Sequence, residues 1–321
     1  MRILVTGGAG FIGSNFVKSV LKGELLQCNE LTVVDKLSYA GTLTNFESSE
    51  LRLFKFIQGD ICDELLMHKL IERTDLVVNF AAESHVDRSI LNSKSFVNSN
   101  IIGTHTILEI VKKYDKKMIQ ISTDEVYGSI AHGSWDENSP IRPNSPYSST
   151  KAAADLLCLA FAHTYNLNIS ITRCSNNYGP NQFPEKIIPL FITNLLEEKK
   201  LPIYGVGDNI RDWLHVSDHC KAISLVTIKG KAGEVYNIGG GTELTNLNLA
   251  QIILNEMGFE TDRIEHVSDR LGHDFRYSVD CSKIKELGFE PFVGFEEGIR
   301  DTINWYRENT DWWTELKKLN G

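Results

Sequence analysis

Two sets of reactive side chains stand close together in the sequence. Tyr147 is followed four residues later by Lys151, and the triplet Thr123-Asp124-Glu125 ends 22 residues before Tyr147. Residues four apart share one face of a helix, so the Lys151 ammonium is expected to favour the phenolate of Tyr147, whose pKa is ordinarily about 10. Tyr147 is then a candidate base for a hydroxyl proton. Asp124 and Glu125 add a second acid–base pair, which a simple alcohol dehydrogenase does not need but an enzyme that also removes water does.

A glycine-rich loop opens the chain. Gly7, Gly10 and Gly13 follow the first apolar run with the spacing G-x-x-G-x-x-G, which is close to the dinucleotide-binding pattern of a strand, a tight turn and a helix N-terminus. Asp35 closes the next apolar run 22 residues after Gly13, where a carboxylate can bind ribose hydroxyls and repels a 2′-phosphate. We therefore expect NAD rather than NADP. Asp60 is a candidate for contact with the adenine.

The elements that must position these residues alternate between short apolar runs and helical stretches. Such alternation predicts a Rossmann-type doubly wound parallel sheet with helices on both faces. Strands are expected at 3–6, 31–35, 52–58, 76–81, 118–122 and 169–173, and helices at 14–22, 65–73, 96–114 and 149–165.

After about residue 175 the pattern loosens, with prolines at 180, 184, 189 and 202. Helical periodicity at 185–198, 247–257 and 295–309 predicts a smaller α/β substrate-binding lobe, while a strand at 234–238 is expected to return to the first lobe. The predicted division is a Rossmann domain over 1–175 plus about 211–240, and a substrate lobe over about 176–210 plus 241–321.

Composition excludes several classes of partner. The chain has 321 residues, of which 42% are hydrophobic and 23% charged, and its net charge of −9 argues against nucleic acid and anionic membranes. No apolar run reaches the ~18 residues that span a bilayer, and the N-terminus enters a strand directly, so no signal peptide is expected. Six scattered cysteines are typical of free thiols in a reducing cytoplasm, and no metal site is predicted.

Seven motifs carry a resemblance to a known family. They are Gly7–Gly13, Asn79–Arg88, Ser122–Gly128, Tyr147 with Lys151, Cys174–Pro180, Phe183–Pro189 and Arg211–Val216. Across essentially the whole chain the sequence resembles the extended short-chain dehydrogenases/reductases, and among them the nucleotide-sugar 4,6-dehydratases. The triplet at 123–125 is the most specific element, because related 4-epimerases carry small hydroxyl residues there.

The resemblance implies a reaction with an internal oxidation and reduction. Tyr147, with Thr123 hydrogen-bonded to the same hydroxyl, would take the proton from sugar O4 while C4 passes hydride to NAD⁺. Glu125 would remove the C5 proton and Asp124 would protonate the departing O6. Hydride would then return to C6 and a proton to C5, giving a 4-keto-6-deoxy sugar and regenerating NAD⁺.

The resemblance also implies two sets of binding residues. Those expected to contact NAD are Gly7, Gly10, Phe11, Ile12, Gly13, Asp35, Lys36, Ser38, Asp60, Ile61, Ala81, Ala82, Ser99, Tyr147, Lys151 and Asn177. Those expected to line the nucleotide-sugar site are Ser84, His85, Thr123, Asn176, Lys186, Ile187, Arg211, Asn246, Arg270 and His273. Arg211 suits a diphosphate, because guanidinium binds phosphate oxygens in a bidentate fork.

Two departures from the family pattern bear on the substrate. Members that act on thymidine nucleotides usually carry an aromatic residue at the position of Asn181, and Leu271 replaces a frequent proline. The resemblance favours dTDP-glucose, while Asn181 favours UDP-glucose or UDP-N-acetylglucosamine. A 4-epimerase and a non-catalytic NAD-sensing protein are less favoured alternatives.

A homodimer is expected from the same resemblance. The helices predicted at 96–114 and 149–165 carry more apolar residues than one sheet face needs, and in the family such helices pair across a two-fold axis. The surplus consists of Ile101, Ile102, Ile107, Leu108, Ile110, Leu156, Leu157, Leu159 and Phe161.

Overall fold

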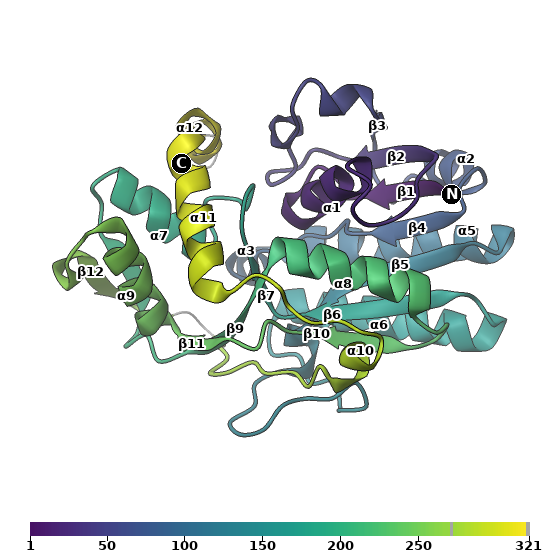
Figure 1. The fold of residues 1–321 in the computed structure, drawn as a ribbon. Helices are drawn as coiled ribbons and strands as arrows, with labels where there is room; N and C mark the ends of the chain where they lie inside the picture. Colours follow the sequence, from purple (N-terminus) through teal and green to yellow (C-terminus); the bar gives the residue numbers. More distant parts are fainter. Residues whose placement is uncertain (270–271, 319–321) are drawn as a thin grey trace.

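A computed structural model of the chain describes residues 1–269 and 272–318. Its centre is a seven-stranded, fully parallel sheet in the order β10-β6-β5-β4-β1-β2-β3 (Figure 1). Strands β2 and β3 follow β1 on one side of it, and β4, β5, β6 and β10 then follow in order on its other side. This is the doubly wound Rossmann arrangement. The strands are β1 (Arg2–Thr6), β2 (Glu30–Asp35), β3 (Lys55–Gln58), β4 (Leu76–Asn79), β5 (Lys117–Thr123), β6 (Ile169–Cys174) and β10 (Val235–Ile238).

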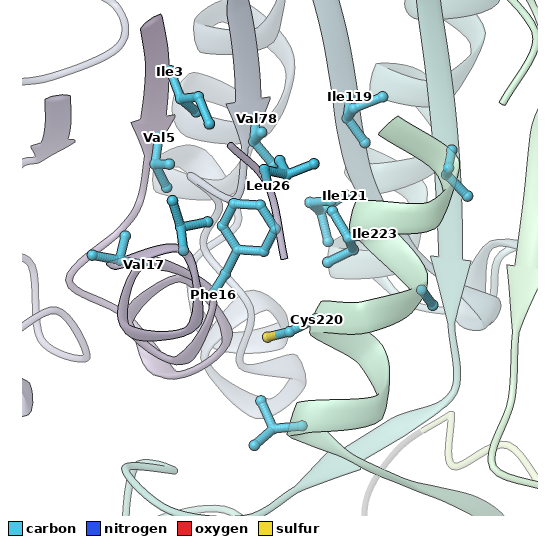
Figure 2. Close-up of a cluster of buried hydrophobic side chains, with 14 of the residues drawn as sticks. Ile3, Val5, Phe16, Val17, Leu26, Val78, Ile119, Ile121, Cys220 and Ile223 are labelled. Carbon is cyan, nitrogen blue, oxygen red and sulfur yellow. The ribbon is translucent and has the colours of Figure 1, made fainter. Parts of the chain in front are cut away.

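Helices cover both faces of this sheet because its strands alternate apolar side chains between two cores. On one face Val5 and Val78 pack with Phe16 of α1 (Phe11–Leu21) and Ile223 of α8 (Val216–Lys229), as Figure 2 shows. On the other face a second core includes α2 (Glu64–Ile71), α5 (Thr104–Tyr114) and α6 (Pro146–Tyr165). The prediction of a doubly wound α/β fold is confirmed.

The predicted helix at 96–114 is not one continuous α-helix. It comprises α4 (Lys94–Phe96), a π-helical turn η3 (Val97–Gly103) and α5. The turn brings Ser99 into the lining of the cleft described below, while Asn100 is buried and hydrogen-bonded to the Glu83 backbone and to Thr150. Such π turns occur often at functional sites, and hydrophobic periodicity does not reveal them.

The predicted strand at 52–58 starts later than expected. A short 3₁₀ turn η2 (Glu50–Arg52) ends at its first residue, β3 begins only at Lys55, and η1 (Leu43–Asn45) precedes both. Two further short helices join the sheet's carboxyl edge, α3 (Val86–Leu91) and the 3₁₀ turn η4 (Asp124–Tyr127).

The rest of the chain gathers at one end of the sheet around a third apolar core (Figure 1). Its larger elements are α7 (Ile187–Leu196), α9 (Asn246–Met257), α11 (Phe295–Glu308) and α12 (Thr310–Lys318), together with a parallel pair, β8 (Leu201–Tyr204) and β12 (Ile264–Val267). Three short elements complete this part: the 3₁₀ turn η5 (Thr261–Arg263), and β7 (Asn176–Tyr178) and β11 (Glu243–Thr245), which flank β9 (Ile210–His215) in a separate three-stranded sheet.

The segment 211–240 therefore contributes to two sheets. Strand β10 pairs with β6 in the large sheet, and α8 belongs to the core beneath it, whereas β9 pairs with β7 and β11. Helix α10 (Ser282–Glu286) also packs on β10, through Ile284 in the first core. Among residues 1–269 and 272–318, no helix is long and apolar enough to cross a membrane.

Candidate active site

A cleft runs along the carboxyl edge of the large sheet, where β1, β2, β4, β5 and β6 end. In an open α/β sheet this edge, at the reversal of strand order, is where ligands bind. All of the residues predicted to contact the dinucleotide line it: Gly7, Gly10, Phe11, Ile12, Gly13, Asp35, Lys36, Ser38, Asp60, Ile61, Ala81, Ala82, Ser99, Tyr147, Lys151 and Asn177. Thr123, Asp124 and Glu125 line the same cleft.

The glycine loop owes its shape to the close approach of backbone segments. Gly7 has a φ of +68°, and a Cβ there would lie 2.5 Å from the Ala81 nitrogen, while a Cβ on Gly13 would lie 2.4 Å from the Gly7 oxygen. Gly10 precedes α1 and supplies no side-chain cap. The first amides of α1 therefore have no side-chain cap at the edge of the cleft, and such amides are the groups that bind a pyrophosphate.

Asp35 is buried at the end of β2 and is attached to the glycine loop. Its carboxylate accepts hydrogen bonds from the Ala9 amide at 3.0 Å and the Leu37 amide at 2.8 Å. Burial raises the pKa of Asp35, while these two amides oppose that shift. The carboxylate lies in the cleft lining at the position predicted for recognition of ribose hydroxyls. These features fit a dinucleotide such as NAD.

Lys36 brings a positive charge into the same half of the cleft. Its ammonium donates to Ser99 Oγ at 2.7 Å and lies 3.2 Å from a carboxylate oxygen of Glu83. These contacts hold the long side chain in one place, so both Lys36 and Ser99 present fixed polar groups to the cleft.

The tyrosine and lysine lie near the start of α6, where Ser145 caps the helix by accepting from the Ser148 amide. Tyr147 and Lys151 are both buried. The Lys151 ammonium donates to the carbonyl oxygen of Ile121 on β5 at 2.6 Å, and the Tyr147 amide donates to Ser89 Oγ at 3.1 Å. Helix α6 is thus fixed to β5 and α3 at the residues predicted to be catalytic.

The expected direction of the Tyr147 pKa is wrong for this arrangement. Burial and the neighbouring Glu125 carboxylate raise the pKa of Tyr147 well above its usual value, and only a hydrogen bond with Thr123 opposes them. Burial also lowers the pKa of Lys151, whose ammonium is engaged with the Ile121 carbonyl. Helical spacing alone missed this, because the desolvation of both groups and the Glu125 charge arise only in the folded cleft.

The pKa of the Asp124 carboxyl group is strongly perturbed. Its side chain is 3% exposed, its Oδ1 accepts from the Thr123 hydroxyl at 3.2 Å, and its Oδ2 has no hydrogen-bond partner within the described part of the chain. Burial, then Glu125, then Asp212 raise the pKa of Asp124 well above its usual value. A carboxyl group in this environment retains its proton and can act as an acid.

The residues predicted to bind substrate divide into two groups. Ser84, Asn176 and Lys186 line the cleft together with Thr123, and Lys186 donates to the Ser84 carbonyl at 3.1 Å. The second group, which lies outside the lining, consists of His85, Ile187, Arg211, Asn246 and His273. Arg270 and Leu271 fall outside the described residues.

Two members of the second group, His85 and Ile187, adjoin residues that line the cleft. His85 caps α3, with its Nε2 3.7 Å from Glu185, and Ile187 begins α7 directly after Lys186. Asn246 begins α9 and is buried. His273 lies 2.7 Å from Asp269.

Arg211 is anchored by backbone carbonyls. Its guanidinium donates to the carbonyls of Ile210, Asp274 and Phe275 and lies 4.4 Å from the centre of the Tyr277 ring. It also exerts a favourable charge effect on ionised Asp124, which shows that it lies within electrostatic range of the triplet. Its predicted contact with a diphosphate remains a prediction.

Asn181 makes two hydrogen bonds within the protein. Its side chain is buried, with Oδ1 accepting from Lys18 at 2.8 Å and Nδ2 donating to Asn45 at 3.4 Å. Its φ of +67° lies in the left-handed region, which asparagine tolerates better than an aromatic residue. Asparagine therefore suits both this backbone conformation and the hydrogen bonds that its side chain makes. A role of residue 181 in reading the nucleotide base remains a prediction.

Several lining residues were missed by the sequence analysis. They come mostly from the segments after β2 and β6 and from the turn before α7: Val34, Tyr39, Ala40, Gly41, Gly59, Phe80, Ile121, Ser122, Cys174, Ser175, Gln182, Phe183 and Glu185. Most of them are next to a predicted residue in the sequence. They could have been found by including the residues on either side of each predicted strand end. Tyr39 is different, because it reaches across to Phe183 in an edge-on contact with ring centres 5.5 Å apart.

A Rossmann sheet with a Tyr-x-x-x-Lys helix and an acidic pair at its carboxyl edge defines an enzyme of the extended short-chain dehydrogenase/reductase class. Comparison with known proteins narrows this class. The family model described as GDP-mannose 4,6 dehydratase matches residues 4–302, and the chain belongs to that family.

Curated relatives and solved structures agree with this assignment. The chain is 54% identical to a dTDP-glucose 4,6-dehydratase of Streptomyces niveus over 99% of this chain and 96% of that protein. It is also 54% identical to one from an Actinoplanes species, over 98% and 100% of the two chains. The structure of DesIV, a dTDP-glucose 4,6-dehydratase from Streptomyces venezuelae solved with NAD bound, superposes with a TM-score of 0.96 at 50% identity, covering 98% and 100% of the two chains.

Proposed function

We propose that this chain is an NAD-dependent dTDP-glucose 4,6-dehydratase, which converts dTDP-glucose to its 4-keto-6-deoxy sugar. One observation carries the proposal: a buried carboxyl group with a raised pKa, Asp124, lines the same cleft as Tyr147 and Lys151. The names of the most similar relatives support the same activity. A 4-epimerase would need the tyrosine and lysine but not the acidic pair, so the acidic pair favours the dehydratase.

The residues that would hold NAD are those of the cofactor half of the cleft. The amides at the start of α1 suit the pyrophosphate, Asp35 suits the adenosine ribose, and Lys151 and Ser99 are polar groups within reach of the other half. When bound, NAD⁺ accepts hydride from sugar C4 and later returns it to C6. Because the cofactor is regenerated in each turnover, it has no need to leave.

In the first step the ionised form of Tyr147 takes the proton from the sugar O4 hydroxyl. Because burial raises the pKa of this phenol, the ionised form depends on the positive charges of Lys151 and of NAD⁺ when it is bound. The phenol is hydrogen-bonded to Thr123, which holds it at the end of β5 beside the acidic pair. The Lys151 ammonium, fixed by the Ile121 carbonyl, supplies positive charge one turn away on the same helix. The 4-ketone that results makes the C5 proton acidic.

In the second step the acidic pair removes water across C5 and C6. Glu125 takes the C5 proton, and Asp124 gives its proton to O6, which departs as water. Two carboxyl groups can perform opposite tasks only when their surroundings separate their pKa values, and the deep burial of Asp124 is such a surrounding. Protonation of C5 then completes the 4-keto-6-deoxy product.

The chain's division into lobes belongs to the same proposal. The large sheet with α8 and β10 would hold the cofactor over 1–175 plus about 211–240, and the part built on the third core would hold the nucleotide sugar over about 176–210 plus 241–321. We place the enzyme in the cytoplasm, in keeping with free cysteines at 28, 62, 158, 174, 220 and 281.

A homodimer is also part of the proposal, on a narrower apolar face than the sequence indicated. Ile107, Leu108 and Ile110 are buried in the second core, whereas Ile102 and Leu156 are 49% and 53% exposed. Burial of these two residues against a second copy would form an isologous interface between the faces of η3 and α6.

The activity is tested by product mass. The purified protein is incubated separately with dTDP-glucose, UDP-glucose and UDP-N-acetylglucosamine. The proposal expects loss of one water from dTDP-glucose with the highest kcat/KM of the three. An isomer of unchanged mass would indicate an epimerase, and no turnover of any of the three would contradict the proposal.

A further inference from the structure

A buried ion pair lies one helical turn beyond Lys151. Asp155 on α6 accepts from Arg173 Nε on β6 at 2.9 Å, and the two side chains are 0% and 2% exposed. The other carboxylate oxygen of Asp155 has no hydrogen-bond partner among residues 1–269 and 272–318. A buried ion pair with an unsatisfied oxygen does not make a core more stable, because apolar residues of similar volume usually stabilise a fold at least as well.

Arg173 is held rigidly from two further elements. One of its terminal nitrogens donates to the Tyr127 hydroxyl of η4 at 2.7 Å, and its guanidinium lies 4.7 Å from the centre of that ring. The Tyr127 hydroxyl in turn donates to Asn237 Oδ1 on β10 at 2.8 Å. The pair therefore fastens the middle of α6 to β6, to β10 and to the turn that carries Asp124.

Asp155 lies four residues after Lys151 on α6, so the two side chains share one face of the helix. Side chains in a helix lean toward its N-terminus, so a residue at i+4 covers the turn at i. Lys151 is itself buried, with its ammonium 2.6 Å from the Ile121 carbonyl. Asp155 is the carboxylate that acts most favourably on this ammonium.

The other ionisable groups around Lys151 carry little charge of their own. Burial raises the pKa of Cys158 on α6 far above its usual value and that of Cys174 on β6 to about 12, so both thiols are neutral. Strand β5 contributes the uncharged Ile121 carbonyl, and the raised pKa of Tyr147 favours its neutral phenol until cofactor and substrate bind. From η4, Glu125 and Asp124 act on Tyr147, and the Arg173 guanidinium brings a positive charge to α6 through its contact with Asp155.

We propose that Asp155 is a positioning residue: anchored by Arg173, it holds the turn of α6 that carries Lys151 and supplies the negative charge that balances the buried ammonium. The role rests on the proposed function, since it concerns the sugar oxidation that Tyr147 and Lys151 perform. Without Asp155, the uncompensated Arg173 charge repels the ammonium, and Lys151 loses its proton at lower pH.

The test uses full-length protein with its bound cofactor and dTDP-glucose as substrate, and measures kcat across pH for the wild type and three variants. Asp155→Asn should lower kcat at neutral pH and move the alkaline limit of kcat down by about one pH unit. The reason is that the Lys151 ammonium loses the negative charge of Asp155, while the positive charge of Arg173 is no longer neutralised. The double variant D155N/R173Q removes both charges and should return the limit toward that of the wild type. Asp218→Asn is the matched control, since Asp218 is an equally buried carboxylate that accepts from the Phe292 and Val293 amides away from the cleft.

The outcomes separate the inference from the proposed function. If the wild type does not turn over dTDP-glucose, the proposed function is wrong. If the wild type is active but Asp155→Asn keeps its alkaline limit, or Asp218→Asn shifts it equally, Asp155 has only a structural role. If Asp155→Asn does not fold, the double variant decides: a wild-type alkaline limit with lowered kcat supports the inference, and full wild-type kcat contradicts it.

Discussion

The Lys151 ammonium donates to the backbone carbonyl of Ile121 at 2.6 Å, one helical turn from the Tyr147 phenol. This contact ties α6 to β5 at the end where Thr123, Asp124 and Glu125 follow. The base and the acidic pair are therefore held by two adjoining elements, and their relative positions depend on the packing of α6 against the sheet.

The Tyr147→Phe variant should lose the first oxidation. Without the phenol the proposed base for the O4 proton is lost, so kcat should fall at least ~10²–10⁴-fold. Absorbance of the bound cofactor at 340 nm should not rise on mixing with dTDP-glucose. A variant that still reduces its cofactor would assign the O4 proton to another residue; Tyr114→Phe, a change at a partly buried tyrosine outside the cleft, serves as the control.

Asp35 should determine the choice of dinucleotide. Protein purified without added nucleotide should contain NAD(H), because the buried carboxylate beside the glycine loop repels a 2′-phosphate. Asp35→Ser should reduce the discrimination against NADP. Mass analysis of the released nucleotide makes the measurement, and recovery of NADP(H) from the wild type would contradict the assignment.

The pH dependence of both stability and elimination should reflect the titration of Asp124. Its folded-state pKa is raised, so the folded protein keeps this proton above the pKa of the unfolded chain, and the associated stability is present at low pH and declines as pH rises through the raised value. Elimination should fall over the same range, because the ionised group no longer protonates O6.

Asp124→Asn should remove this stability decline and slow turnover ~10²–10⁴-fold. Melting temperatures measured across pH give the first effect and product formation the second. If wild type and variant show parallel stability curves, Asp124 does not titrate in this range.

Asn181 should affect stability rather than the choice of base. Asn181→Gly keeps the left-handed backbone but loses the hydrogen bond with Lys18, a loss of about 1.5–3 kcal/mol for a bond to a charged group. Asn181→Tyr should lose more, since a bulky side chain is strained at a φ of +67°. The ratio of kcat/KM for dTDP-glucose and UDP-glucose should stay unchanged in both; a marked shift only in the tyrosine variant would restore the base-reading role.

The dimer should depend on Leu156. This side chain is 53% exposed on α6, and Leu156→Asp places a charge in the proposed interface without disturbing the core. Light scattering should give a dimer for the wild type and a monomer of about 36.2 kDa for the variant. Leu91→Asp, at an 87% exposed position on α3, is the control and should remain dimeric. A monomeric wild type would contradict the proposal.

The sequence was sufficient for the features that depend on local chemistry. The glycine turn, the carboxylate at the end of β2 and the Tyr-x-x-x-Lys spacing need only short segments, and each lies where it was expected. The features that were missed depend on tertiary contacts. Examples are the π turn that presents Ser99, the contact of Tyr39 with Phe183, and the carbonyls that hold Arg211.

The direction of the Tyr147 pKa shows the same limit. Spacing on a helix identifies Lys151 as a neighbour, but the net shift is a balance among desolvation, the carboxylates of Asp124 and Glu125, and the hydrogen bond with Thr123. None of these magnitudes can be obtained before the cleft is folded.

The central claim is that oxidation and water loss use separate proton systems in one cleft, and the Glu125→Gln variant tests it most directly. After rapid mixing with dTDP-glucose, absorbance at 340 nm should rise as the bound cofactor is reduced, while formation of the dehydrated product slows ~10²–10⁴-fold. Dehydration at the wild-type rate, or loss of the 340 nm rise together with the product, would contradict the account.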